Sequence, residues 1–280
     1  MRGSLLDALR AAWHTPGGRG GVLVLAGIAI LALLAPVLLQ DPAAMPDLMA
    51  GAQPPGPGHL LGTDALGRDI LSRTAHGARV SLGIAAVAVL VSVVVGTTVG
   101  AVSGQAGGWL DSVLMRLVDA GLAIPRLLLL LLLVLVWERI PPVTLALVIG
   151  ATGWLGTSRM VRGEVLRLRR LEFIRAAEAL GASRWRIIVR HLIPNAAGPV
   201  AVSATLGVAD VIMLEAGLSF LGVGVQPPTP SWGGMILEAR PEMFSAPWTS
   251  LAPGLAILVT VLAVNLVGDA LRGALDPRSA

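Results

Sequence analysis

The chain has 280 residues, of which 55% are hydrophobic and 14% are charged, and its formal net charge is +4. It contains no cysteine, which excludes disulfide frameworks, thiolate nucleophiles and cysteine-ligated metal sites. All 21 basic residues are arginine, so the chain lacks the lysine that a P-loop places beside the phosphates of ATP.

Six apolar runs predict an all-α integral membrane protein with six transmembrane helices, because several of them approach the ~20 residues that cross a bilayer as a helix. The first run is uncharged and longer than the apolar part of a signal peptide, so we expect a retained helix. Pro125 should bend the third run. In chain order the runs are 21–39, 80–102, 112–137, 143–158, 196–223 and 251–267.

Arginine accumulates in one segment, which sets the expected orientation. Residues 159–190 hold nine arginines against three glutamates, and such a segment is expected to be cytoplasmic. Counting the apolar runs in both directions from it places both termini on the cytoplasmic side, N-in and C-in. The segments 41–79, with three arginines and four aspartates, and 224–250, with one arginine and two glutamates, then lie outside.

Within the first outside segment, residues 63–79 have the pattern of an amphipathic helix. Thr63 is its expected N-cap, and Asp64 would interact favourably with the helix dipole. This helix would act as a structural brace or as a contact for a partner on the outside.

The segment "RAAEALGASRWRIIVRHLIPN", residues 175–195, lies between two long apolar runs and predicts a helix-turn-helix-like bracket outside the membrane. Gly181 would allow the turn, and Ser183 would cap a second short helix. On that helix Trp185, Ile188 and Leu192 would share one face, and Pro194 would begin the fifth span. The alternative is a positive loop that only fixes topology. Small side chains around the turn favour close approach of another surface; they are Ala176, Ala177, Ala179 and Ala182.

Three acidic residues fall inside or beside the apolar runs. Asp119 follows Arg116 by three residues, which predicts an intrahelical pair, with a gate element as the alternative. Asp210 and Glu215 are five residues apart and do not share a helical face well. Each of the two would line a translocation path, pair with another subunit, or lie at the membrane interface.

The segment 175–195 resembles the EAA loop of binding-protein-dependent ABC importers. The family pattern falls on Ala176, Ala177, Gly181 and the pair Ile193-Pro194, whereas Arg175 stands where the family has glutamate. Four further segments resemble the C-type permease of dipeptide, oligopeptide and nickel importers. They are "LGTDALGRDILSRTAHGARVSL", "GGWLDSVLMRLVDAGLAIP", "EAGLSFLGVGVQPPTPSWGGMI" and "NLVGDALRGALDPR".

This resemblance implies a half-channel of the type I importer fold in a bacterial or archaeal cell membrane. The chain would pair with a second, homologous permease, two cytoplasmic ABC ATPase subunits that hold ATP and magnesium, and an extracytoplasmic solute-binding protein, with no nucleic-acid partner. The chain itself would be non-catalytic and would hold no cofactor or metal. The residues expected to couple it to the ATPases are Arg175, Ala176, Ala177, Gly181, Ala182, Trp185, Arg186, Ile193 and Pro194.

The implied organisation follows the expected topology along the chain. It comprises a cytoplasmic N-terminus (1–20), a first transmembrane helix (21–40), an outside segment (41–79), the importer core (80–273) with its cytoplasmic coupling loop (159–195), and a cytoplasmic tail (274–280).

Peptide is favoured over nickel as cargo because the expected membrane path lacks histidine and cysteine, which suit such a metal. A secondary transporter is the second class of function, but the chain has no convincing internal repeat. A membrane-embedded enzyme is the third, but H-E-x-x-H, G-x-S-x-G and paired metal ligands are all missing.

Overall fold

The computed structural model describes residues 10, 13–39 and 50–275, and within them the protein is helical, with one isolated β-bridge, Thr63 to Asp69. The predicted all-α class is therefore confirmed for the described part of the chain. The helices are α2 (Pro16–Leu38), α3 (Ile70–Ala106), α4 (Gly108–Ala123), α5 (Arg126–Val134), α6 (Pro142–Leu168), α7 (Glu172–Ala179), α8 (Arg184–Ile187), the π-helix η2 (Ile188–Leu192), α9 (Ile193–Phe220), α10 (Trp232–Glu238), the 3-10 helix η3 (Arg240–Glu242) and α11 (Trp248–Leu275).

Four helical stretches of the described chain are long and apolar enough to cross a membrane: α2, α3, the continuous stretch from α8 to α9, and α11. The pair α4 and α5 supplies a fifth if it forms one span. The remaining apolar run, 143–158, lies in α6, whose C-terminal part carries several arginines. The six-helix count and the N-in/C-in orientation stay predictions.

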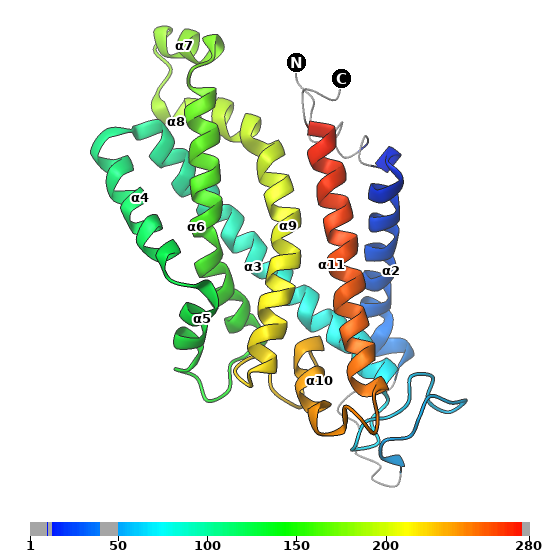
Figure 1. Ribbon diagram of the computed structural model, residues 1–280. Helices are drawn as coiled ribbons and strands as arrows, with labels where there is room; N and C mark the ends of the chain where they lie inside the picture. Colours follow the sequence, from blue (N-terminus) through cyan, green and yellow to red (C-terminus); the bar gives the residue numbers. More distant parts are fainter. Residues whose placement is uncertain (1–9, 11–12, 40–49, 276–280) are drawn as a thin grey trace.

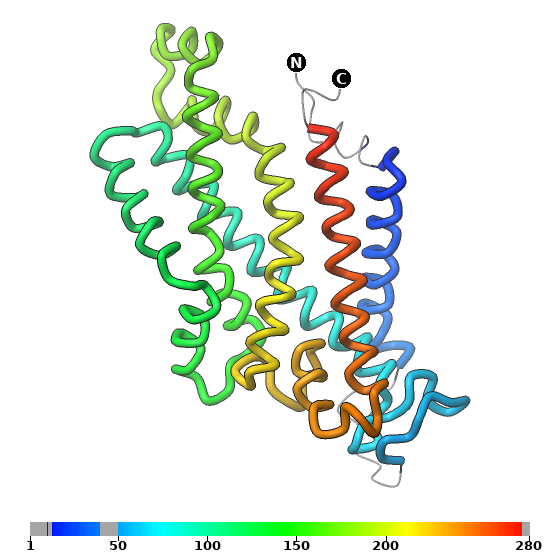
Figure 2. The backbone as a smooth tube through the Cα atoms, in the orientation of Figure 1, coloured from blue at the N-terminus to red at the C-terminus, as the bar shows by residue number. Residues whose placement is uncertain are grey.

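The bundle has two distinct ends (Figure 1). At one end α7 projects beyond the other helices, on the same side as the first turn of α2 and the last turn of α11. At the opposite end lie α10 and the segment 50–69. The helix α3 crosses the bundle diagonally and connects the two ends (Figure 2). The predicted cytoplasmic loop and the described parts of the predicted outside segments therefore lie at opposite ends.

The third apolar run is broken as expected at Pro125. The helices α4 and α5 meet there at an angle of 86°. Pro125 has no backbone N–H to donate and disfavours helical geometry at the residue before it, and Ile124 is extended with ψ 128°.

The predicted amphipathic helix over 63–79 is wrong. Its N-cap is not Thr63 but Asp69, whose side chain accepts from the Ser72 N–H at 2.7 Å, and α3 then runs without interruption into the bundle. Asp64 explains the difference, because its Oδ1 accepts from the N–H groups of Leu66 and Arg68 and so holds a turn that competes with a helix. Residues 41–49 of the predicted outside segment, and residue 40 at the end of the predicted first transmembrane helix, lie outside the described residues.

Glycines on α3 allow it to pack closely against α6. They recur every fourth residue, at Gly96, Gly100 and Gly104. A Cβ at Gly100 would lie 2.5 Å from the Ser158 carbonyl oxygen, and one at Gly96 would lie 2.6 Å from the Thr157 Cβ. Small residues at this spacing let helix backbones approach in membrane proteins, so the glycine-rich run of α3 serves helix packing.

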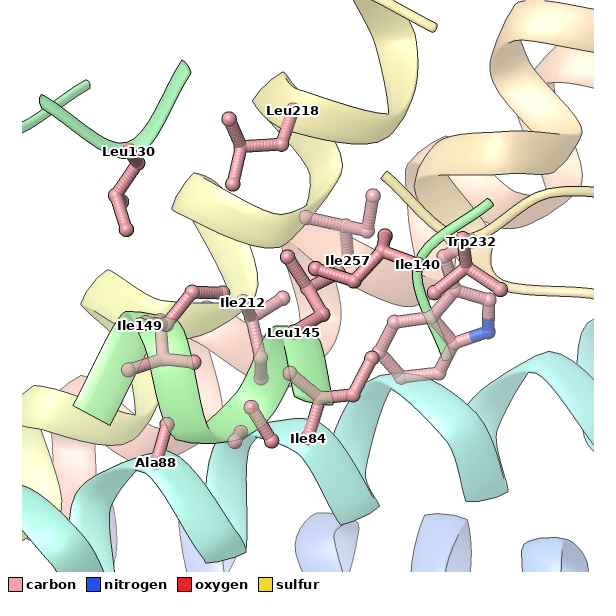
Figure 3. Close-up of a cluster of buried hydrophobic side chains, with 14 of the residues drawn as sticks. Ile84, Ala88, Leu130, Ile140, Leu145, Ile149, Ile212, Leu218, Trp232 and Ile257 are labelled. Atoms are coloured by element: carbon pink, nitrogen blue, oxygen red, sulfur yellow. The ribbon is translucent and has the colours of Figure 1, made fainter. Parts of the chain in front are cut away.

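The main hydrophobic core joins α2, α3, α5, α6, α9, α10 and α11, and Figure 3 shows part of it. Trp232 at the start of α10 is buried in it, and the Trp232 Nε1–H donates to the Thr74 carbonyl oxygen at 2.9 Å. The residues labelled in Figure 3 are Ile84, Ala88, Leu130, Ile140, Leu145, Ile149, Ile212, Leu218, Trp232 and Ile257.

Candidate functional site

The projecting structure formed by α7, residues 180–183 and α8, called the bracket below, is the first candidate site. Its base is fixed by a second hydrophobic cluster in which Ile174 of α7 and Ile187 of α8 are buried with Val165 of α6. Arg169 contributes to the same base, because its Nη1 donates to the Gly104 carbonyl oxygen of α3 at 2.9 Å. The bracket is therefore attached to the ends of both α3 and α6.

The turn of the bracket has the hydrogen bonds of a Schellman motif. The Ala182 N–H donates to the Ala177 carbonyl oxygen at 3.0 Å, and the Gly181 N–H donates to that of Glu178 at 3.0 Å. Gly181 has φ +79°, a conformation that glycine adopts without the Cβ penalty of other residues. The predicted turn at Gly181 is confirmed.

The second arm of the bracket begins as predicted, with the Ser183 side chain accepting from the Arg186 N–H. Its predicted apolar face is wrong at one position. Ile188 and Leu192 are buried, but Trp185 is 65% exposed. The buried side of α8 carries Ile187, which lies two residues after Trp185 and therefore on the opposite side of the helix. The chain continues as a π-helix over Ile188–Leu192.

Most of the coupling residues expected from the sequence lie on the open surface of the bracket. Arg175, Ala176, Trp185 and Arg186 are exposed, and Ala177 and Ala182 are half-buried at the Schellman turn. Ile193 and Pro194 lie at the start of α9, behind the bracket. Leu180, which sequence reasoning did not select, is 88% exposed beside Gly181.

The exposed side of the bracket combines apolar and basic side chains. Leu180 and Trp185 are joined there by Phe173, which is 43% exposed. The two short helices also expose Arg175, Arg184 and Arg186. Large apolar groups exposed among cations are typical of a protein contact surface.

Asp119 does not form the predicted intrahelical pair with Arg116. Its carboxylate instead pairs with Arg159 of α6, and both side chains are more than half exposed. This pair links α4 to α6 on the side of the bundle near the bracket.

Asp210 lies in the middle of α9 and pairs with Arg126, with 2.6 Å between Asp210 Oδ2 and Arg126 Nη1. Sequence reasoning did not select Arg126 as a site residue. The one sequence feature that could have indicated a role for Arg126 is its position inside an apolar run, directly after the predicted bend at Pro125.

Glu215 is completely buried within the described part of the protein. Its carboxylate accepts from the Ser219 hydroxyl at 2.7 Å and the Ser81 hydroxyl at 3.1 Å. The same two serine oxygens accept the backbone N–H groups of Val225 and Trp232. Glu215 therefore organises the connection between α9 and α10, facing away from Asp210 as the five-residue spacing predicts.

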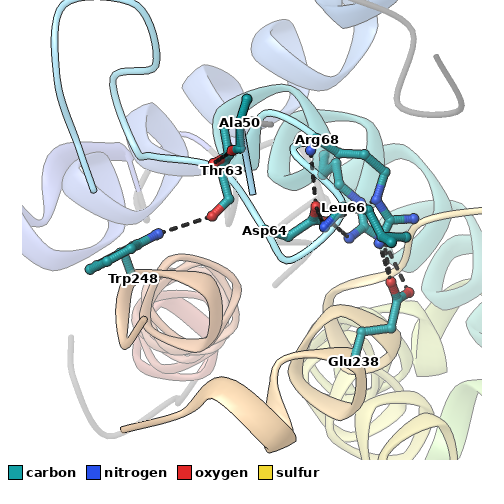
Figure 4. A network of polar contacts seen from close by, with 8 residues as sticks. Ala50, Thr63, Asp64, Leu66, Arg68, Glu238 and Trp248 are labelled. Atoms are coloured by element: carbon teal, nitrogen blue, oxygen red, sulfur yellow. Dashed lines mark hydrogen bonds and ion pairs between the residues drawn. The ribbon is translucent and has the colours of Figure 1, made fainter. Parts of the chain in front are cut away.

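At the opposite end, a network of two arginines and two carboxylates ties the segment 50–69 to α10 (Figure 4). Asp64 binds Arg68 at 2.7 Å and Arg73 at 2.6 Å, and both arginines also contact Glu238. Trp248 of α11 adds a hydrogen bond from its Nε1–H to the Thr63 carbonyl oxygen. Sequence reasoning missed Arg73 and Glu238 as partners because 165 residues separate them.

No group of three or more histidine and acidic side chains suited to a metal ion occurs among the described residues. The arrangement instead offers a contact surface at one end, ion pairs between helices within the bundle, and a rigid polar network at the other end.

Comparison with known proteins agrees with this arrangement. Residues 96–280 match the sequence model of the family described as "Binding-protein-dependent transport system inner membrane component". The chain is 38% identical to the oligopeptide transport system permease protein OppC of Bacillus subtilis, over 92% of this chain and 84% of that protein. It is 39% identical to the dipeptide transport system permease protein DppC of Alkalihalophilus pseudofirmus, over 92% of this chain and 84% of that protein. It is 37% identical to the dipeptide transport system permease protein DppC of Bacillus subtilis, over 97% of this chain and 85% of that protein.

Proposed function

The chain belongs to the family of binding-protein-dependent transport system inner membrane components, and from this we propose that it is one permease of an ATP-driven importer of dipeptides or oligopeptides. As a member of this family it is a multi-pass membrane component of a transport system. It would form half of the translocation path, with a second, homologous permease as the other half.

The bracket is the observation that carries this proposal. Its two short helices meet at a Schellman turn, and they expose Leu180, Trp185 and several arginines to a partner outside the bundle. A short amphipathic helix seated in a groove is a common mode of protein recognition. The bracket would thus bind one of two cytoplasmic ATPase subunits.

The attachment of the bracket supports mechanical coupling. Arg169 joins it to α3, and the buried cluster around Ile174 joins it to α6 and α9. A movement imposed on the bracket by closure of the ATPase pair would therefore reach three long helices as a rigid-body displacement. This chain has Arg175 where the family has glutamate. The turn of the bracket does not need that glutamate carboxylate, because it is held by backbone hydrogen bonds.

The two ends of the bundle support the N-in, C-in orientation. The bracket lies with the first turn of α2 and the last turn of α11, while α10 and the segment 50–69 lie opposite (Figure 1). The latter end would face the solute-binding protein. Nickel remains the alternative cargo, and the similarity to dipeptide and oligopeptide permeases favours peptides.

Transport by the reconstituted complex tests the proposal. The chain, a homologous permease, two ATPase subunits and the binding protein would be placed in vesicles with ATP. We expect uptake of labelled peptides and none of nickel. Nickel uptake without peptide uptake would assign the other cargo, and solute uptake that needs no ATPase subunits would contradict the importer mechanism.

The energy supply can be tested on the chain alone. Without partner subunits it should hydrolyse no ATP, because a chain without lysine cannot form a P-loop. Phosphate release from ATP would be measured before and after addition of the ATPase subunits. ATP hydrolysis by the pure chain would contradict the proposal.

A further inference from the structure

A hollow that is open on one side of the bundle contains the pair formed by Arg126 and Asp210. Its volume is about 260 Å³, and it lies between α3, the start of α5, α6 and α9. Besides this pair, its polar lining residues are Ser92, Thr152, Thr157 and Ser203. The hollow is therefore next to the break between α4 and α5 and far from both ends of α9.

Arg126 is held in place from α6. Its Nη2 donates to the Ile149 carbonyl oxygen at 3.0 Å, and its Nε donates to the Thr152 hydroxyl at 3.3 Å. Its third nitrogen, Nη1, binds Asp210 Oδ2. The guanidinium is thus fixed on three sides.

Asp210 is the more open member of the pair. Its side chain is 61% exposed, compared with 29% for Arg126. Within the described part of the chain, Arg126 is the one group for which a contact with this carboxylate is found, through Oδ2, so Oδ1 is available to a further ligand. The pair therefore presents an oriented carboxylate to the hollow.

The position of these charges indicates contact with water. Charged side chains within apolar spans face a water-filled cavity or a partner, and an interrupted helix at that depth is tolerated where it lines a cavity. The charges of Arg126 and Asp210 sum to zero, so the pair would bind a passing peptide only weakly. Weak binding suits a translocation path, which must release its cargo. The ammonium group at the N-terminus is common to peptides of any sequence and is complementary to a carboxylate.

We propose that Asp210 binds the N-terminal ammonium group of the peptide as it crosses the membrane, with Arg126 as the residue that positions the Asp210 carboxylate. This inference rests on the proposed transport function. It assigns to one carboxylate a role in recognition that does not depend on the peptide's side chains.

Cysteine reporters test the electrostatics of the hollow directly. Ser203→Cys would be introduced into the assembled complex with cysteine-free partner subunits, since this chain has no native cysteine. A cationic thiol reagent should react faster than an anionic one of similar size. Asp210→Asn should reduce this preference about tenfold, as expected for a charge-assisted interaction. An unreactive Ser203→Cys, or an unchanged preference, would overturn the proposal.

Uptake of matched peptides tests the role of the ammonium group. A peptide and its N-acetyl form would be compared in proteoliposomes, with each rate divided by the amount bound to the binding protein. Asp210→Asn should lower uptake of the free-amino peptide about tenfold and leave that of the acetylated peptide unchanged. The double variant Arg126→Gln with Asp210→Asn, which leaves no unpaired charge, should behave in the same way. Asp269→Asn, which changes an exposed carboxylate near the C-terminal end of α11, serves as the matched control.

The outcomes separate the two proposals. If the unmodified complex imports no peptide, the proposed function fails. If it imports peptide and both Asp210 variants keep the original ratio of free-amino to acetylated uptake, only the role assigned to Asp210 fails.

Discussion

At the residue scale, Glu215 illustrates how one buried carboxylate can hold a connection between helices. Glu215→Leu should destabilise the protein by about 1–3 kcal/mol, because two buried serine hydroxyls would lose their acceptor. Glu215→Gln has a side chain of similar shape and keeps one acceptor oxygen, so it should destabilise the protein less than Glu215→Leu. Thermal unfolding of both variants in detergent measures the difference. Equal stability of Glu215→Leu and the unmodified chain would contradict the role assigned to the two serine contacts.

Gly181 is the second residue whose role can be isolated. No atom of the described residues lies within 4 Å of a Cβ built there, yet its φ of +79° is strained for a β-branched residue. Gly181→Val should therefore leave insertion and pairing with the second permease intact, while it weakens ATPase attachment and transport. Co-purification of the ATPase subunits and uptake in cells are the measurements.

Arg170→Ala is the matched control for Gly181→Val. Arg170 is exposed, whereas its neighbour Arg169 binds the Gly104 carbonyl oxygen. Loss of one exposed charge contributes under about 1 kcal/mol, so Arg170→Ala should retain ATPase binding. Normal ATPase recovery and uptake with Gly181→Val would mean that the bracket is only a topogenic loop.

At the element scale, the close packing of α3 on α6 depends on glycine. Gly100→Ala should destabilise the protein by about 1–3 kcal/mol, because the added methyl would lie 2.5 Å from the Ser158 carbonyl oxygen and force the helices apart. Gly83→Ala, in the same helix with open space around it, should be neutral or slightly stabilising. Melting temperatures of the two variants in detergent test this. If both melt alike, the glycines do not set the distance between the helices.

At the scale of the whole molecule, the orientation of the bundle can be mapped by single cysteines. Reporters at Pro55 and Thr229 should react with an impermeant thiol reagent from outside, and reporters at Arg170 and Arg272 only after permeabilisation. All four positions are exposed, so burial does not obscure the readout. Labelling of Arg170→Cys in intact cells would invert the orientation and place the bracket away from the ATPases.

Several features of this protein follow from its sequence because they depend on short stretches of backbone. The apolar runs predict membrane helices, since each run satisfies its own backbone hydrogen bonds within lipid. Pro125 breaks a helix and Gly181 closes a Schellman turn through constraints on their own dihedral angles. The four-residue spacing of glycines likewise indicates close helix packing before any partner helix is known.

The partners of the charged residues are decided only by the tertiary structure. Asp119 binds Arg159 instead of the nearby Arg116, Asp210 binds Arg126, and Arg73 meets Glu238 across 165 residues of sequence. Trp185 is exposed because the buried side of α8 carries Ile187, two residues further on and on the opposite side of the helix. Local spacing carries no information about such contacts, because a buried or intramembrane charge is paired with whichever opposite charge the packing of distant helices brings within reach.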